Sequence, residues 1–172
     1  MDVVKRNVEK LRGRVEVRSG EEGTEFTLKI PLTLAIVDGV TVKVGRGTYA
    51  LRLDDILEFH KAERRRVTRT QEGGEVLRLR EEILPVIKLH EFFAVETEKR
   101  EVDEGLVVVT QAEGRKVALL VDGIEGYQQI VVKALPAYLG RLRGISGCSV
   151  LGDGTVSLIV DIGTLVKEEL EQ

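Results

Sequence analysis

Few side chains in this sequence have the chemistry that catalysis or metal binding requires. Its 172 residues include two histidines, His60 and His90, and one cysteine, Cys148. Metal centres and nucleophilic triads need several such groups at suitable spacing, but the sequence has no His-x-x-x-His or Cys-x-x-Cys pattern. We therefore interpret both histidines as surface or capping residues, and Cys148 as a small core residue in an expected strand.

Two glycine-rich clusters, at residues 45–48 and 152–155, contain the small residues typical of phosphate-binding loops. A phosphate cradle is followed by a helix N-terminus, whereas each of these clusters precedes an expected strand. Both are therefore predicted to be hairpin turns, with Asp153-Gly154 as a primed-turn pair.

Two pairs of adjacent acids, Asp54-Asp55 and Glu81-Glu82, are the remaining candidates for acid–base chemistry. On a strand, neighbouring side chains point to opposite faces, so the two carboxyl groups of a pair would not converge. The sequence therefore predicts no acid–base couple.

One cluster of basic residues lies between residues 60 and 70. It consists of Lys61, Arg64, Arg65, Arg66 and Arg69. The cluster could bind an acidic partner or a phosphate, but a solvated segment that protects a strand edge from aggregation is the favoured interpretation. The net charge of −3, the lack of tryptophan and an aromatic content of 4% argue against nucleic-acid binding.

The composition also indicates a compartment. Hydrophobic residues make up 42% of the chain, but no apolar run approaches the ~20 residues that a membrane span needs. Residues 1–6 lack the apolar core of a secretory signal, and a single cysteine fits a reducing environment. We expect a cytoplasmic protein without direct membrane insertion.

The elements that must position any site begin with a short front segment. Residues 2–12 have the apolar spacing of a helix, with Val4, Val8 and Leu11 on one face. Residues 14–18 and 24–30 alternate as two strands, and Pro31 ends the second. A helix with one hairpin is too small to be stable alone, so this segment must pack against other residues.

From residue 32 onward the sequence predicts short strands separated by glycine-containing turns, and a final helix at 161–170 capped by Asp161. The two halves of this region resemble each other: residues 50–56 align with 118–124, and 84–87 with 156–159. A repeat of about 70 residues, each with several short strands, predicts two similar small β-barrels.

Several long blocks carry a resemblance to a known family. The run Met1-Asp2-Val3-Val4-Lys5, residues 13–17 and residues 23–36 resemble the tail of the ATPase domain of CheA-type histidine kinases. Residues 33–168 resemble the CheW-like regulatory domain of the same kinases, with the best matches at 80–86, 120–135 and 145–161.

The resemblance implies a mainly β fold. Residues 32–172 would form a CheW-like domain of two SH3-like five-stranded barrels, at about 37–95 and 104–160, followed by a C-terminal helix. Residues 1–31 would be an α-β-β remnant of the histidine-kinase ATPase domain.

The resemblance also implies a function. The domain would bind the CheW adaptor through its first barrel and the cytoplasmic chemoreceptor tip through a groove between barrels, at membrane-associated receptor arrays. Receptor signals would thereby control autophosphorylation by the remainder of the CheA kinase. The chain itself would not be an enzyme and would hold no cofactor, because ATP and magnesium bind in a kinase domain that this sequence lacks. The alternative is that the chain is part of an active protein-histidine kinase whose catalytic residues lie elsewhere.

The resemblance places the partner-binding site on the first barrel, at Ile56, Phe59, Arg80, Glu82, Ile83 and Pro85. Two alternatives remain open: Ile56 and Phe59 could be core residues, and Arg80 and Glu82 could form an ion pair within the barrel. The family's Arg-Gly-Glu turn is Arg80-Glu81-Glu82 in this chain, and a non-glycine residue at a position that requires positive φ is strained.

Overall fold

The chain divides into two compact units, Met1–Ala35 and Ile36–Gln172. The computed structural model describes residues 2–10, 14–20, 23–29, 35–61, 63–71, 73–112 and 114–170. The sequence placed the boundary between residues 31 and 32, and residues 30–34 lie outside the described part.

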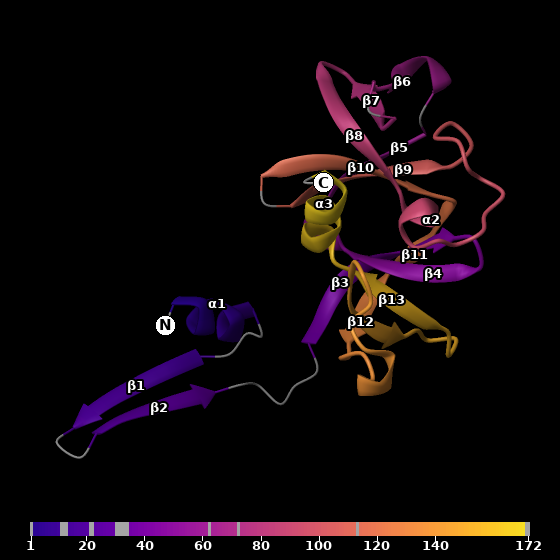
Figure 1. Cartoon of the computed structure of the whole chain (residues 1–172). Helices are drawn as coiled ribbons and strands as arrows, with labels where there is room; N and C mark the ends of the chain where they lie inside the picture. Colours follow the sequence, from indigo (N-terminus) through magenta and orange to yellow (C-terminus); the bar gives the residue numbers. More distant parts are fainter. Residues whose placement is uncertain are drawn as a thin grey trace. The chain divides into compact units, whose positions relative to one another are not determined.

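The first unit contains a helix and a hairpin (Figure 1). Helix α1 (Asp2–Lys10) is followed by the antiparallel strands β1 (Arg14–Gly20) and β2 (Gly23–Lys29), as the sequence predicts. Val8 on α1 is buried, whereas Val17, Phe26 and Leu28 on the hairpin each expose about half of their surface. Leu11, Ile30 and Pro31, which were assigned to these elements, lie outside the described residues.

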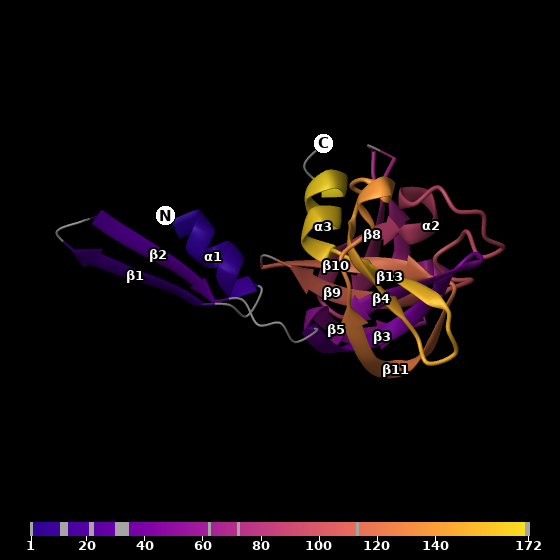
Figure 2. The same ribbon diagram turned by 90° about the horizontal axis from the view of Figure 1, so that it is seen from below.

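The second unit is mainly β (Figure 2). Its described residues form two sheets and two helices, and three short 3₁₀ turns connect the strands. Its elements are β3 (Ala35–Val44), β4 (Gly47–Arg52), η1 (Leu53–Asp55), β5 (Ile56–His60), η2 (Arg64–Arg66), β6 (Val67–Arg69), β7 (Glu75–Leu79), β8 (Glu82–Lys88), α2 (Leu89–Phe92), β9 (Leu106–Ala112), β10 (Arg115–Val121), β11 (Gly123–Val132), η3 (Ala137–Leu139), β12 (Ile145–Val150), β13 (Val156–Val160) and α3 (Ile162–Leu170).

The sheets do not follow the two halves of the chain. One has six strands in the order β5-β9-β10-β8-β7-β6, and the other has five in the order β11-β3-β4-β13-β12. An isolated bridge between Lys133 and Cys148 links the two outer strands of the five-stranded sheet. Each sheet therefore takes strands from both halves, which differs from barrels built separately from residues 37–95 and 104–160.

The repeated segments explain this exchange. Strand β10 of the second half pairs in parallel with β8 of the first, and β13 pairs in parallel with β4. The segments that resemble each other in sequence thus form strands in the middle of the sheets. Each of these strands pairs with a strand from the other half of the chain. Such strands are apolar on both faces, as residues 117–121 illustrate, and the exchange places them where both faces are buried.

Three apolar clusters follow from the alternation of side chains along the strands. Ala118 and Leu120 of β10 join a cluster enclosed by the six-stranded sheet, and Ala50 and Ile159 join one on the five-stranded sheet. The opposite faces of the same strands meet in the largest cluster, which includes Leu119 and receives the buried side of α3. The two sheets therefore share a core.

The predicted caps and turns are mostly confirmed. The carboxylate of Asp161 accepts hydrogen bonds from the backbone N–H and the hydroxyl of Thr164 at 3.2 and 3.0 Å, so it caps α3 as expected. Residues 45–46 turn between β3 and β4. The expected two-residue primed turn at Asp153-Gly154 is wrong, because the connection runs from Leu151 to Thr155 and, of the two, only Gly154 has a positive φ, +86°.

Candidate partner-binding site

The residues with catalytic potential lie apart from one another. His60 Nε2 lies 2.9 Å from Glu58 Oε2, and Cys148 is half-buried on β12. His90 is buried at the start of α2, which corrects the expectation of a surface or capping residue. Within the described residues, no three His, Cys, Asp or Glu side chains are grouped as a metal site would require.

Neither pair of adjacent acids lies inside a strand, because Glu81 occupies the β7–β8 turn and Glu82 is the first residue of β8. Asp54 and Asp55 occupy η1, where Arg52 Nε lies 3.5 Å from Asp55 Oδ2. Burial raises the pKa of Asp55 above its ordinary value. This half-buried carboxyl group pairs within its own turn, and the nearby Asp161, whose charge also raises its pKa, is engaged as the cap of α3.

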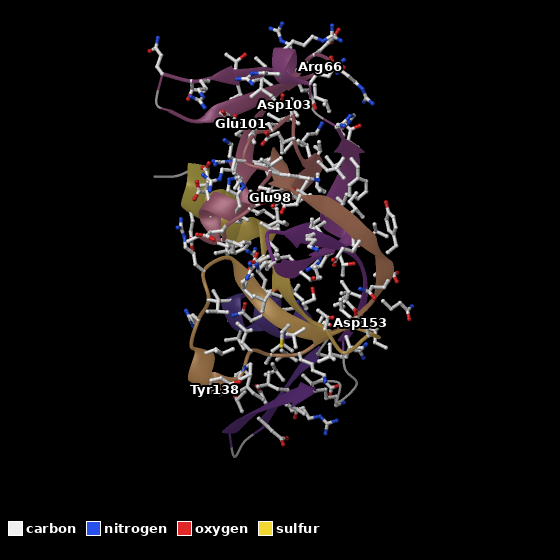
Figure 3. The ribbon with its side chains drawn as sticks, turned by 90° about the vertical axis from the view of Figure 1, so that its right-hand side faces the viewer. Arg66, Glu98, Glu101, Asp103, Tyr138 and Asp153 are labelled. Atoms are coloured by element: carbon white, nitrogen blue, oxygen red, sulfur yellow. The ribbon has the colours of Figure 1, made fainter. Side chains whose placement is uncertain are left out.

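The basic cluster lies along an edge of the six-stranded sheet, with Arg66 at η2 (Figure 3). Glu63 contacts Arg65 and lies 3.8 Å from Arg66, while Arg69 lies 3.2 Å from Glu75. The paired arginines are exposed and lie on the edge strand β6 or in the turn before it, which supports the interpretation of the cluster as a solvated, protected edge.

Two of the predicted site residues support the core. Ile56 and Phe59 on β5 are partly buried and pack against the largest apolar cluster. The Phe59 ring also meets Tyr127 edge to face, with 6.2 Å between ring centroids. Both residues therefore support the core, as the alternative interpretation expected, while part of each side chain stays accessible.

The other four predicted residues lie together on the β7–β8 hairpin. Ile83 exposes 60% of its surface, and Pro85 is half-buried. Glu82 accepts two hydrogen bonds from Lys116 Nζ, at 2.7 and 2.9 Å. Arg80 Nη2 lies 3.3 Å from Glu58 Oε2, so Arg80 and Glu82 pair with other residues rather than with each other.

The turn of this hairpin is strained at Arg80. Leu79 pairs with Glu82, which leaves Arg80 and Glu81 as a two-residue loop. The positive φ lies at Arg80, at +54°, and not at Glu81 as the family pattern suggested. A positive φ at the first loop position is the feature of a type II′ turn, where glycine is preferred.

Sequence reasoning missed Leu57 and Glu58. The register between β5 and β9 shifts between Ile56 and Glu58, and Leu57 at this irregularity is 48% exposed. A bulge re-aims a side chain without leaving a pattern in the sequence. Glu58 could have been noticed only by knowing that β5 lies near the β7–β8 turn.

A second polar region surrounds Asp122, where a hollow of about 730 Å³ opens between residues 43–46, 96–100 and 122–124. The Asp122 carboxylate accepts hydrogen bonds from Gly45 N at 2.6 Å and Thr97 Oγ1 at 2.7 Å. Lys99 Nζ also donates to the Asp122 carbonyl at 2.6 Å. These bonds fasten the 95–105 connection to the β3–β4 turn, which is a structural role.

None of the described helices is long and apolar enough to cross a membrane.

Comparisons with known proteins agree with this architecture. The model of the family described as "CheW-like domain" matches residues 38–170. Among solved structures, the scaffolding protein TtCheW from Thermoanaerobacter tengcongensis aligns with a TM-score of 0.66 and 20% identity, over 77% of this chain and 94% of that one. This similarity supports the fold.

Curated relatives extend the match to almost the whole chain. The chemotaxis protein CheA of Salmonella typhimurium is 40% identical over 100% of this chain, and that of Klebsiella aerogenes is 41% identical over 96%. The sensor histidine kinase CheAY of Helicobacter pylori is 40% identical over 96%. The chain spans about a quarter of the length of these relatives, 26% for the first two and 21% for the third. The chain therefore belongs to the CheW-like domain family, as a non-catalytic regulatory region of the CheA type.

Proposed function

We propose that this chain couples a chemotaxis histidine kinase to a CheW-type adaptor and to the cytoplasmic tips of chemoreceptors. Receptor signals would then control autophosphorylation by the remainder of the kinase, in the cytoplasm at receptor arrays. The observation that carries this proposal is the CheW-like match over residues 38–170 of this chain, which also aligns over nearly its whole length with relatives named CheA.

The adaptor would bind the outer face of the β7–β8 hairpin. Ile83 exposes 60% of its surface there, beside the strained turn at Arg80. Backbone strain is retained where the surrounding structure or function requires it. An exposed aliphatic side chain next to an arginine has the composition of an interface centre.

The front unit supports a link to a larger kinase. Residues 1–35 are covered by the relatives but precede the CheW-like match, which begins at residue 38. Their hairpin leaves Phe26 and Leu28 half-exposed, as expected of a piece that packs against a neighbouring domain. We assign this unit to the ATPase domain of the parent kinase, where ATP and magnesium would bind.

Calorimetric titration with the cognate CheW-type adaptor tests the coupling function. Replacing Ile83 with Thr keeps a β-branched residue on the strand while removing apolar contact, and we expect about tenfold weaker binding. Val156→Thr is the matched control, because Val156 is 58% exposed on the five-stranded sheet and should bind as the wild type does. A chain that gives no binding heat at any accessible concentration would exclude direct adaptor docking. An equal loss of adaptor affinity in Ile83→Thr and Val156→Thr would show that the hairpin is not the binding site.

A further inference from the structure

The C-terminal helix α3 carries two carboxylates in its last turn, where the helix dipole disfavours them. Glu168 and Glu169 share this turn with one basic residue, Lys167, so the turn is net negative. Negative charge is unfavourable at this end of a helix, because the unpaired carbonyl groups already carry partial negative charge. The buried side chains that the structure describes on α3, Ile162, Leu165 and Val166, all precede this turn. The last turn is therefore stabilised by any cation that a neighbouring element brings to it.

Arg143, in the loop before β12, brings this cation. Its Nε donates to Glu168 Oε2, and its Nη2 donates to Glu169 Oε1 at 3.3 Å. One guanidinium thus bridges both carboxylates through its planar fork, which the point charge of a lysine would not reproduce. The three side chains expose between 35% and 49% of their surface, so the pairing is partly shielded from water.

The same guanidinium lies over an aromatic ring of α2. Arg143 Cζ is 4.3 Å from the centroid of the Phe92 ring, which is within cation–π range. Phe92 is 8% exposed, and its ring meets Phe93 edge to face with 5.1 Å between centroids. Arg143 therefore joins a fixed ring on α2 to the last turn of α3.

Two glycines bound the segment that carries Arg143. Gly140 and Gly144 have φ values of +64° and +65°, which glycine adopts without strain. A Cβ at Gly144 would lie 2.5 Å from Phe92 Cε1, whereas one at Gly140 would meet no described atom within 4 Å. Residues 141–143 are thus fixed against α2 at one end and have an open glycine hinge at the other.

Arg143 and its two partners lie between two hollows. One, of about 610 Å³, is lined by parts of residues 134–146 together with Thr164 and Glu168. The other, of about 530 Å³, is lined by residues from β7, β8 and α2 together with Glu169. Arg143 lines both. The ion pairs of Arg143 with Glu168 and Glu169 therefore form a partition between the hollows.

We propose that Arg143 is a salt-sensitive latch that holds the last turn of α3 against α2, and that its release joins the two hollows into one cleft. On release, residues 141–143 turn about Gly140, and the two carboxylates lose their cation. The last turn of α3 then unwinds. Salt opens the latch because mobile ions screen partly exposed pairs. This device is independent of adaptor docking.

Hydrogen exchange of backbone amides, followed by NMR on the 172-residue chain, tests the latch. The amides of residues 167–170 bond to the preceding turn only while the helix is intact, so their exchange reports on its opening. We expect about tenfold faster exchange there in Arg143→Gln at low salt, and a smaller increase in Arg143→Lys. Raising the ionic strength should bring the wild type towards Arg143→Gln. Arg141→Gln is the matched control, because Arg141 is an exposed arginine in the same loop and should leave the exchange unchanged.

A double-mutant cycle separates the latch from simple packing on Phe92. Glu168→Gln/Glu169→Gln removes both carboxylates, so adding Arg143→Gln to this variant should change the exchange by less than about twofold. An equal acceleration in both backgrounds would show that Arg143 acts through packing, and would overturn the proposal. So would wild-type exchange that does not respond to salt, or Arg143→Gln that exchanges as the wild type does.

The same samples test whether the partition opens. A neutral, soluble paramagnetic agent should broaden the ring signals of Phe92 more in Arg143→Gln than in the wild type, because the guanidinium no longer covers the ring. Equal broadening combined with faster exchange at residues 167–170 would mean that the turn unwinds while the partition stays closed, and would overturn the joined cleft. The dispersion of the NMR spectrum confirms that each variant is folded.

Discussion

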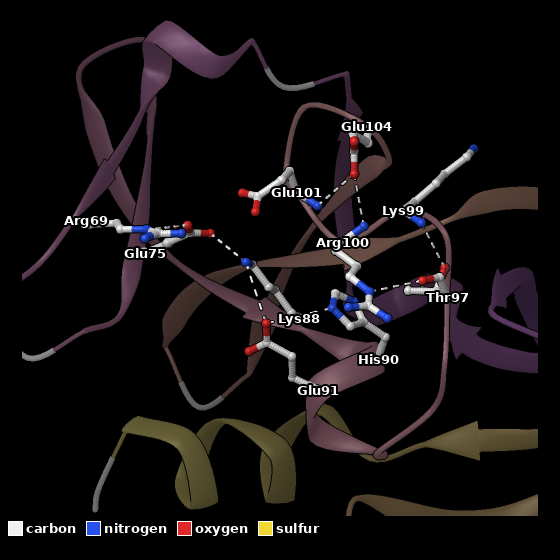
Figure 4. A network of polar contacts seen from close by, with 10 residues as sticks. All are labelled: Arg69, Glu75, Lys88, His90, Glu91, Thr97, Lys99, Arg100, Glu101 and Glu104. Carbon is white, nitrogen blue, oxygen red and sulfur yellow. Dashed lines mark hydrogen bonds and ion pairs between the residues drawn. The ribbon is translucent and has the colours of Figure 1, made fainter.

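Lys88 and Glu75 form an ion pair, with 3.1 Å between Nζ and Oε2, in which the two side chains expose only 13% and 9% of their surface. Arg69 lies 3.2 Å from Glu75, and Glu91 lies 3.6 Å from Lys88 (Figure 4). Alternating charges therefore join β6, β7, β8 and α2. The hairpin that carries Arg80 is fastened to the rest of the domain through the far end of β8.

Removing one member of this pair should destabilise the domain. Lys88→Met leaves the Glu75 carboxylate enclosed without its ammonium partner, and we expect the free energy of unfolding to fall by about 3 kcal/mol. Urea unfolding followed by circular dichroism measures the change.

Two controls test whether the cause is the loss of the ammonium group beside Glu75, which then keeps only its ion pair with Arg69. The double variant Glu75→Leu/Lys88→Met removes both charges and should recover most of the loss. Lys116→Ala breaks the more exposed pair with Glu82 and should cost less than about 1 kcal/mol. A double variant as unstable as Lys88→Met would assign the loss to packing instead.

The same pair predicts how stability depends on pH. Burial raises the pKa of Glu75, but the ion pairs with Lys88 and Arg69 together outweigh burial and hold this pKa below its ordinary value of 4.5. Because the folded-state pKa is lower than the unfolded one, the carboxylate contributes its full stabilisation above about pH 4.5, and this is lost as the pH falls through the folded-state pKa.

We therefore expect the unfolding free energy of the wild type to fall more steeply below pH 4.5 than that of Glu75→Gln. Other carboxylates with lowered pKa values, such as Glu58 and Asp153, remain in both proteins, so the difference isolates Glu75. Urea titrations at a series of pH values provide the measurement. Parallel curves for the two proteins would contradict the assignment.

Much of the fold could be predicted because its signals are local. The alternation of Val40, Val42 and Val44 marks a strand, and Asp161 marks the start of α3. The repeat of residues 50–56 at 118–124 predicted two similar small β-barrels, and the structure places these two segments in its two different sheets. These patterns depend on neighbouring residues, which a single sequence displays.

The mixing of strands from both halves of the chain in each sheet could not be predicted, because it depends on which of several strands far apart in the sequence pair with one another. Strand β10 is apolar on both faces, and β8 satisfies its hydrogen bonds as well as a strand of its own half would. The candidate site shows the same limit. Ile83 was identified through a family pattern, whereas the contact between Glu58 and Arg80 depends on how β5 and the β7–β8 turn meet in space.

Ala94 should gain stability when replaced by glycine. It ends α2 with a φ of +52°, and the backbone N–H of Val95 donates to His90 O at 2.8 Å, as in a Schellman motif. Glycine removes the left-handed strain, so we expect Ala94→Gly to raise the unfolding free energy by about 1 kcal/mol. Ala112→Gly, within β9, should lower it by a similar amount. A loss in both variants would indicate that chain entropy outweighs strain at Ala94.

Two buried threonines should respond in opposite ways to valine, which has nearly the same shape. Thr110 is fully buried on β9, and its hydroxyl has no hydrogen-bond partner in the described structure. The hydroxyl of Thr41, also buried, donates to Gly126 O at 3.2 Å and accepts from Gln128 Nε2 at 3.4 Å.

Thr110→Val should therefore raise the unfolding free energy by about 1 kcal/mol, because it removes a polar group that is desolvated without compensation. Thr41→Val should lower it by about 1 kcal/mol, because it leaves the Gly126 carbonyl without its donor. Chemical denaturation of the two variants side by side gives both signs in one experiment. Destabilisation by Thr110→Val would contradict this prediction and would mean that the Thr110 hydroxyl has a hydrogen-bond partner. A buried water molecule is the natural candidate, and a crystal structure would reveal it.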